Sequence, residues 1–207
     1  AHGALVTSDA CMTFFFIASV GAWWSHLHGP SWRAWALSAL LTGLAFVAKY
    51  SAVLLVPMML AMAAVRAVNP EPWRFGRWEF KGAGQKFGFA AVSALGHALV
   101  AFVVIWAFYG FRYSAFNPAL PPAADFIRPW SSYVGITGSM GDLTRAMARW
   151  KMLPEGFLYG FDYVLATTKA RAAFLNGEHS VTGWRTFFVW TFLMKTTLPV
   201  LIAAGVT

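Results

Sequence analysis

Long apolar runs separated by short polar segments dominate the chain. Four of these runs cover 10–24, 34–48, 50–65 and 87–111, and a fifth covers 186–206. The fourth run exceeds the roughly 20 residues that a helix needs to cross a bilayer. The first three are shorter, so they span a membrane only with help from flanking Trp, His and Arg side chains, or they are partly re-entrant. No alternating strand pattern is evident, so we expect an all-α, polytopic transmembrane protein with about five membrane segments.

The segment 112–183, between the fourth and fifth runs, is predicted to be an outer loop that carries interfacial amphipathic helices. Asp142 is a candidate N-cap for a helix through Lys151. Apolar side chains recur along one face of this helix at i, i+4 and i+7, namely Leu143, Met147 and Trp150. A basic amphipathic helix of this kind tends to lie flat on a membrane. A second, aromatic-rich helix is expected over 156–174.

Composition supports the membrane interpretation. The chain of 207 residues is 58% hydrophobic and 12% charged, and its mean hydropathy is +0.56. A soluble protein carries about 25% charged residues, so a soluble enzyme is excluded. The net charge of +8 would suggest nucleic acid as a partner in a soluble chain. Here basic loops beside apolar runs point instead to membrane lipids and topology, and we expect no nucleic-acid partner.

The distribution of basic residues predicts an orientation. The loops 25–33 and 66–86 together hold six Lys or Arg residues, whereas the junction between the second and third runs holds only Lys49. Because short loops rich in Lys and Arg stay in the cytoplasm, both loops are predicted to be cytoplasmic. Asp9, Lys49 and the segment 112–183 are then expected on the outer side.

Asp9 and Lys49 are the sharpest candidates for a functional site. Asp9 precedes a long run without another acidic residue until Glu71. It is either a helix N-cap or a carboxylate at the outer surface that holds an acceptor, a lipid phosphate or a metal. Lys49 is either a snorkelling side chain at a helix end or a ligand of a lipid phosphate. Their shared face favours a single site.

Other charged and polar residues are weaker candidates. Lys195 lies within the fifth apolar run, where a charge is costly, so either it faces a polar cavity or the helix begins later. Glu178 and Arg185 flank the entry to that run and are either site residues or a solvated pair. His2 is expected to pack or hydrogen-bond at a helix end. His97, within the fourth run, is expected to make an interhelical hydrogen bond. No Cys/His cluster has the spacing of a zinc site.

Three ordered segments resemble the motifs of one enzyme family. The opening AHGALVTSD is similar to the signature AHG-x-LVT-T-D, and GLAFVAKYS, followed by Pro57, resembles GLA-x-x-TK-[YF]-[ST]…P. The last segment, LNGEHS through GW and then KTTLP, is similar to LxGexSxxGWW…KTPLP. The chain thus resembles bacterial membrane glycosyltransferases of the GT-C fold, related to protein O-mannosyltransferases and the lipid A aminoarabinose transferase (glycosyltransferase family 39). It departs from the motifs at Ser8, Ala48, Arg185 and Thr197.

The resemblance implies a fold and an activity. Residues 1–207 would be an internal fragment, inactive alone, of one integral glycosyltransferase domain in the bacterial inner membrane. The enzyme would move a sugar from a polyprenyl-phosphate donor to a protein, lipid or glycan acceptor at the outer face. Branches of the family differ in whether they need a divalent metal, so no cofactor is specified. The alternative is a non-catalytic membrane protein, either a transporter or a polyprenyl-phosphate-binding scaffold.

The resemblance also assigns residues. The main catalytic acid of the family lies in the first outer loop, upstream of this chain. Asp9 matches a second acidic position in the catalytic site. Lys49 and Lys195 match lysines expected to bind the donor phosphate, and His2, Glu178 and Arg185 would support the site.

Overall fold

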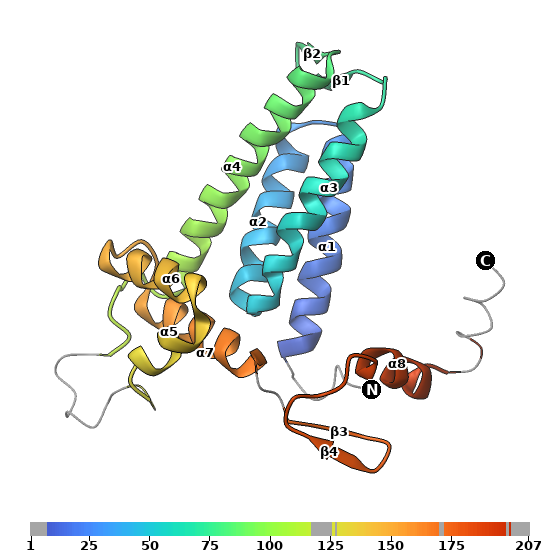
Figure 1. Cartoon of the computed structure of the whole chain (residues 1–207). Coiled ribbons are helices and arrows are strands. Elements are labelled where there is room, and N and C mark those ends of the chain that lie inside the picture. The colour runs from blue at the N-terminus through green and yellow to red at the C-terminus, as the bar shows by residue number, and fades with distance from the viewer. Residues whose placement is uncertain (1–7, 117–125, 127, 170–171, 198, 200–207) are drawn as a thin grey trace. The chain divides into compact units, whose positions relative to one another are not determined.

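Four helices that follow one another in sequence make the core of the molecule (Figure 1). The structure is a computed structural model that describes residues 8–116, 126, 128–169, 172–197 and 199. Contacts divide these residues into two units. We call the first unit, built from residues up to 116 together with 146–158, the bundle. The second unit comprises 126–145 and the described residues from 159 onward.

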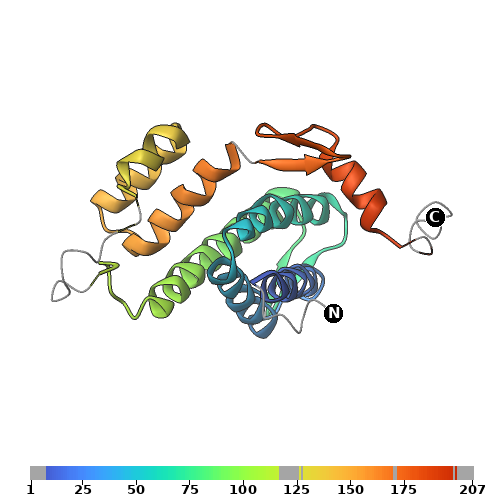
Figure 2. The same ribbon diagram turned by 90° about the horizontal axis from the view of Figure 1, so that it is seen from below.

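The bundle contains α1 (Ser8–His28), α2 (Trp32–Ala48), α3 (Leu55–Val68) and α4 (Ala83–Phe108), with the 3₁₀ helix η2 (Tyr50–Leu54) leading into α3. The helices lie side by side, and α2 packs extensively against both α1 and α4 (Figures 1 and 2). Ser31 caps α2, because its hydroxyl accepts a hydrogen bond from the amide of Ala34 at 3.2 Å. Successive helices of the bundle run in opposite directions (Figure 1).

Three helices in the described part of the chain are long and apolar enough to cross a membrane: Asp9–His28, Tyr50–Val68 and Ala83–Phe108. The apolar α2 has 17 residues. These helices are compatible with an integral membrane protein. The predicted fifth segment appears only as α8 (Phe187–Lys195), because 198 and 200–207 lie outside the described residues. Five membrane segments are therefore not confirmed.

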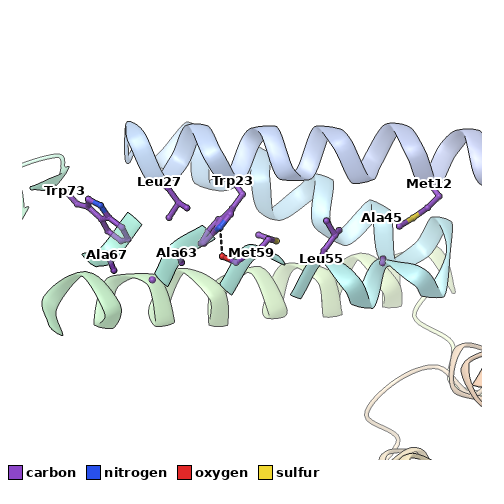
Figure 3. Packing of buried hydrophobic residues seen from close by; sticks show 11 residues of the cluster. Met12, Trp23, Leu27, Ala45, Leu55, Met59, Ala63, Ala67 and Trp73 are labelled. Atoms are coloured by element: carbon purple, nitrogen blue, oxygen red, sulfur yellow. Dashed lines mark hydrogen bonds between the residues drawn. The ribbon is translucent and has the colours of Figure 1, made fainter. Parts of the chain in front are cut away.

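A string of buried side chains joins α1 and α3 along the bundle (Figure 3). Trp23 and Leu27 of α1 are almost fully buried, as are Leu55 and Ala63 of α3. The indole N–H of Trp23 donates to the carbonyl of Met59 at 2.9 Å. Many large apolar residues on the opposite helix faces are exposed. Such faces suit contact with lipid, in which they need no further burial.

Small residues let α2 and α4 approach closely. A Cβ placed on Gly43 would lie 3.0 Å from a methyl group of Val104, and one on Gly96 would lie 2.5 Å from the ring of Trp35. Beside this contact, His97 Nε2 and the Ser38 hydroxyl are 3.0 Å apart. The predicted interhelical hydrogen bond of His97 is confirmed. It gives a polar group in the apolar interior the partner that it needs.

Two short β-hairpins interrupt the otherwise helical chain. Strands β1 (Trp73–Phe75) and β2 (Trp78–Phe80) pair antiparallel, and so do β3 (Ala173–Leu175) and β4 (Glu178–Ser180). The second turn is Asn176–Gly177, and both residues have positive φ, 51° and 89°. Asn-Gly is the residue pair that two-residue hairpin turns favour.

The helices of the segment 112–183 differ in their ends from the prediction. The helix expected over 156–174 is α7 (Glu155–Lys169), and strand β3 begins at Ala173. Helix α6 (Ser139–Arg149) begins before Asp142, so Asp142 lies in its first turn and does not cap it. Leu143 is exposed on α6, and Trp150 is exposed just after the helix ends. A short helix, α5 (Ser131–Thr137), precedes it.

Candidate functional site

Lys49 marks a sharp break between two helical segments. Helix α2 ends at Ala48, and Lys49 is extended, with φ −165° and ψ 143°. Its amide still donates to the carbonyl of Ala45 at 3.1 Å, and η2 begins at the next residue. The lysine side chain therefore projects from the end of the bundle instead of lying along a helix.

Asp9 lies at the same end of the bundle and forms an ion pair with Lys49, Nζ to Oδ1. Both side chains are partly open to solvent, with 72% of Asp9 and 43% of Lys49 exposed. Helix α1 begins at Ser8, so Asp9 occupies the first turn, where the helix dipole favours a carboxylate. The structure thus brings the two strongest candidates together, and their functional roles stay a prediction.

Lys49 lines a pocket of about 230 Å³ together with aromatic residues: Phe46, Tyr50, Tyr109 and Phe157. The Tyr50 hydroxyl donates to the carbonyl of Phe157 at 3.1 Å, and the two rings are 5.2 Å apart. Burial raises the pKa of Tyr109 above its ordinary value of 10.0. Its hydroxyl therefore stays protonated at neutral pH and can donate a hydrogen bond.

Hydrogen bonds from the end of α4 and from the chain after it hold the segment that carries Phe157. The indole of Trp106 donates to the carbonyl of Met152 at 3.0 Å, and the Tyr113 hydroxyl donates to that of Ala148 at 3.0 Å. The Glu155 carboxylate accepts from the amide of Ala115 at 3.0 Å. These bonds fix the start of α7 against the end of α4, so the pocket wall does not depend on apolar contacts alone.

A larger cavity of about 340 Å³ lies among α2, α3 and α4. Its walls are almost entirely apolar and include Met59, Leu60, Ala98 and Phe102. Phe46 lines both this cavity and the Lys49 pocket. Phe46 is therefore common to a charged, aromatic pocket at the Lys49 end of the bundle and an apolar cavity that extends along the helices.

The remaining predicted site residues are not part of the described bundle. Lys195 is exposed and is the last residue of α8. Glu178 is exposed in β4, Arg185 is exposed before α8, and no ion pair joins the two in the described residues. All three belong to the second unit, which is described by itself. His2 lies outside the described residues.

Sequence reasoning missed several residues. Tyr109 and Phe157 carry no local signal, because they reach the Lys49 pocket only through folding. In the second unit, Asp162 is fully buried and accepts a hydrogen bond from the indole of Trp130 at 2.6 Å. The Thr144 hydroxyl lies 2.8 Å and 2.9 Å from its two oxygens. This buried carboxylate ties α6 and α7 to the residue before α5.

Metal ligands do not gather in the described part of the chain, where no group of three or more His, Cys, Asp or Glu side chains has the geometry of a metal site. Comparison of the chain with protein-family models, with curated proteins and with solved structures finds no match.

Proposed function

We propose that this chain belongs to a membrane glycosyltransferase that takes a sugar from a polyprenyl-phosphate donor. The observation that carries the proposal is that one residue, Phe46, lines both the Lys49 pocket and the apolar cavity. A polyprenyl-phosphate sugar has the same two-part character, with an anionic, polar head and a long apolar tail. We place the site at the outer face of a bacterial inner membrane, as the resemblance and the basic loops suggest.

Lys49 is the proposed ligand of the donor phosphate. An ammonium group suits a phosphate as a point charge, and 43% of this side chain is exposed and open to a ligand. Asp9 holds it in place before the donor arrives. The aromatic walls offer a sugar ring apolar faces, and the Tyr109 hydroxyl offers a hydrogen-bond donor.

The reaction that fits this arrangement is direct displacement at the sugar. A hydroxyl or amine of the acceptor attacks the anomeric carbon and forms the new bond, and the bond from that carbon to the phosphate oxygen breaks. Lys49 stabilises the negative charge that develops on the leaving phosphate. A carboxylate takes the acceptor proton as general base. The resemblance gives that role to an acidic residue upstream, and Asp9 a secondary role beside it.

A binding experiment tests the lipid-phosphate part of the proposal. The purified chain in detergent is titrated with geranylgeranyl phosphate and, as a matched ligand, geranylgeraniol, which lacks only the phosphate. We expect clear preference for the phosphate and a loss of about tenfold in affinity in Lys49→Ala, the size of one charge-assisted contact. Lys81→Ala is the control, because Lys81 also loses an exposed ion pair, with Glu79 at 3.2 Å. Equal affinity for the two ligands would overturn the proposal.

A transfer assay tests the catalytic part. Membranes of cells that express the full-length protein, with the upstream acidic residue, are supplied with a labelled polyprenyl-phosphate sugar, and labelled acceptor is counted. We expect Asp9→Asn and Lys49→Ala each to lower transfer while membrane insertion stays at the wild-type level. Phosphate-dependent binding with wild-type transfer in both variants would favour the non-catalytic scaffold instead.

A further inference from the structure

The end of the bundle opposite Asp9 carries a concentration of basic side chains. Helices α1 and α3 end there, and α4 begins after the β1–β2 hairpin (Figure 1). Residues 66–86 contain five Lys or Arg residues and only two acids, Glu71 and Glu79. Asp9 and His26 mark the two ends of α1 and are about 25 Å apart along the helix axis, at 1.5 Å per residue. This region is therefore distinct from the Lys49 pocket.

Two of these basic side chains are buried. Arg66 in the last turn of α3 is 9% exposed, and Lys86 in the first turn of α4 is 1% exposed. Each lies on the buried face of its helix. Arg66 is close to the buried Ala63 and Ala67 on α3, and Lys86 lies one turn before the buried Ala90 on α4. Arg and Lys are rarely buried unless they are paired, because an uncompensated buried charge lowers folding stability by roughly several kcal/mol.

Their hydrogen-bonding capacity is only partly used. Lys86 donates to the neutral carbonyl of Asn69 at 2.5 Å and forms no ion pair within the described residues. Arg66 Nη2 pairs with Glu71 at 3.2 Å, whereas Arg66 Nε and Nη1 have no acceptor. The buried indole N–H of Trp73, in the adjoining β1, also has none. Three donors without acceptors, and a lysine without an ion pair, therefore lie at one end of the bundle.

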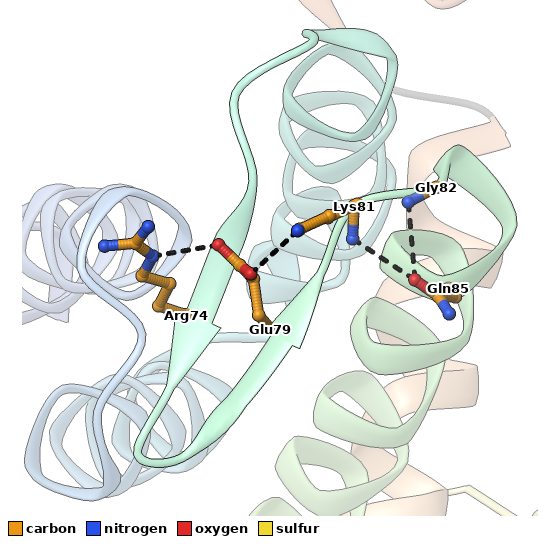
Figure 4. A network of polar contacts seen from close by, with 5 residues as sticks. All are labelled: Arg74, Glu79, Lys81, Gly82 and Gln85. Carbon is orange, nitrogen blue, oxygen red and sulfur yellow. Dashed lines mark hydrogen bonds and ion pairs between the residues drawn. The ribbon is translucent and has the colours of Figure 1, made fainter.

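The other acid at this end does not supply the missing acceptors. Glu79 is held by Arg74 at 3.1 Å and by Lys81 at 3.2 Å on the hairpin (Figure 4). Glu71, the partner of Arg66, is 72% exposed and lies in the exposed connection between α3 and β1. A stronger anion can therefore displace Glu71 without opening the packed helices.

We infer that this end of the bundle binds a phosphate group, with Arg66 and Lys86 as its ligands. A phosphate presents several acceptor oxygens; guanidinium matches them with two parallel N–H groups, and ammonium adds a point charge. It would take the positions now held by Glu71 and the Asn69 carbonyl. The group is either the headgroup phosphate of an anionic lipid or free phosphate. Exposed Trp78 and Trp32 at this end are of the type that lies at membrane surfaces.

The test uses the full chain in detergent micelles and counts bound lipid by native mass spectrometry. The probes are phosphatidic acid, diacylglycerol with the same tails but no phosphate, and inorganic phosphate as a competitor. We expect phosphatidic acid to bind and diacylglycerol not to bind. Displacement of phosphatidic acid by millimolar inorganic phosphate would support the site with free phosphate as its ligand, and persistence of the complex would support the lipid. Equal binding of the two lipids would overturn the inference.

Variants distinguish a specific phosphate site from nonspecific attraction of an anionic lipid to a basic surface. Arg66→Gln should weaken phosphatidic acid binding by about tenfold, and Arg77→Gln, an exposed arginine of the same hairpin, by less than about twofold. Equal losses in the two variants would overturn the site. Glu71→Gln should keep or raise the affinity, because it removes the competing carboxylate; this variant preserves the test if Arg66→Gln fails to fold. A loss in Glu71→Gln as large as expected for Arg66→Gln would also count against the site.

The variants test the Lys49 pocket and the Arg66–Lys86 phosphate site separately. Lys49→Ala should leave phosphatidic acid binding at the wild-type level, and Arg66→Gln should leave geranylgeranyl phosphate binding unchanged. If Lys49→Ala alone removes phosphatidic acid binding, the hairpin site is wrong and the Lys49 pocket stands.

Discussion

Lys49 at the end of α2 forms an ion pair with Asp9 in the first turn of α1, 40 residues earlier in the sequence. Both side chains are substantially exposed. An exposed pair of this kind contributes little to folding, because water screens it and two side chains lose freedom. Its consequence is geometric: the ammonium group of Lys49 is held at the rim of the aromatic pocket.

The first prediction concerns this pair. Asp9→Asn and Lys49→Ala should each leave the unfolding temperature of the chain in detergent close to that of the wild type, because the interaction is exposed. Differential scanning fluorimetry checks this. A fall as large as that caused by a mutation in the core would show that the pair holds the bundle together, and reduced transfer in these variants would then reflect misfolding.

The second prediction concerns the contact between α2 and α4. Gly96→Ala should destabilise the bundle by about 1–3 kcal/mol, the usual cost of overpacking, because its Cβ would overlap the ring of Trp35. Gly88→Ala on the same helix meets no atom within 4 Å and should be neutral or stabilising by up to about 1 kcal/mol, since Ala favours helices. Denaturant titration measures both. A stable Gly96→Ala protein would show that the helices pack less closely.

The third prediction concerns pH. Hydrogen bonds from Lys81 and then Arg74 hold the pKa of Glu79 below its ordinary value of 4.5. The folded-state pKa lies below the unfolded one, so the stabilisation is fully present above pH 4.5 and is lost as the pH falls through the folded value. Carboxyl ¹³C NMR of Glu79 should show this lowered pKa. Lys81→Met should move it up towards 4.5, and Arg77→Met should not.

The fourth prediction concerns the buried carboxylate of the second unit. Asp162→Ala leaves the indole of Trp130 and the hydroxyl of Thr144 without their acceptor. The cost should be about 1.5–3 kcal/mol, as for hydrogen bonds to a charged group, and proteolysis within 126–145 should be faster. Asp142→Ala, an exposed acid of α6 that pairs with Arg145 at 3.8 Å, is the control and should change stability by less than about 0.5 kcal/mol. Equal proteolysis of both variants would contradict the prediction.

The sequence anticipated the helices of the bundle but not their ends. Apolar runs report helices well, because a helix satisfies its own backbone hydrogen bonds in lipid. In the structure, α1 continues past the predicted run 10–24 to His28. The hydropathy pattern missed this last turn because His26, which is buried inside the bundle, is a polar residue and ends the apolar run. The hairpin over 73–80 escaped notice because its strands have three residues each.

Sequence alone determined that apolar helices alternate in direction and that Asp9 and Lys49 lie at the same end of the bundle. Both conclusions follow from local hydropathy and from the number of apolar helices between the two residues. Only the tertiary structure decided that Phe157 joins Tyr50 across 107 residues, and that Arg66, Lys86 and Asp162 are buried. Whether a charged side chain meets water or protein depends on which distant segments pack against it, and no local pattern records that.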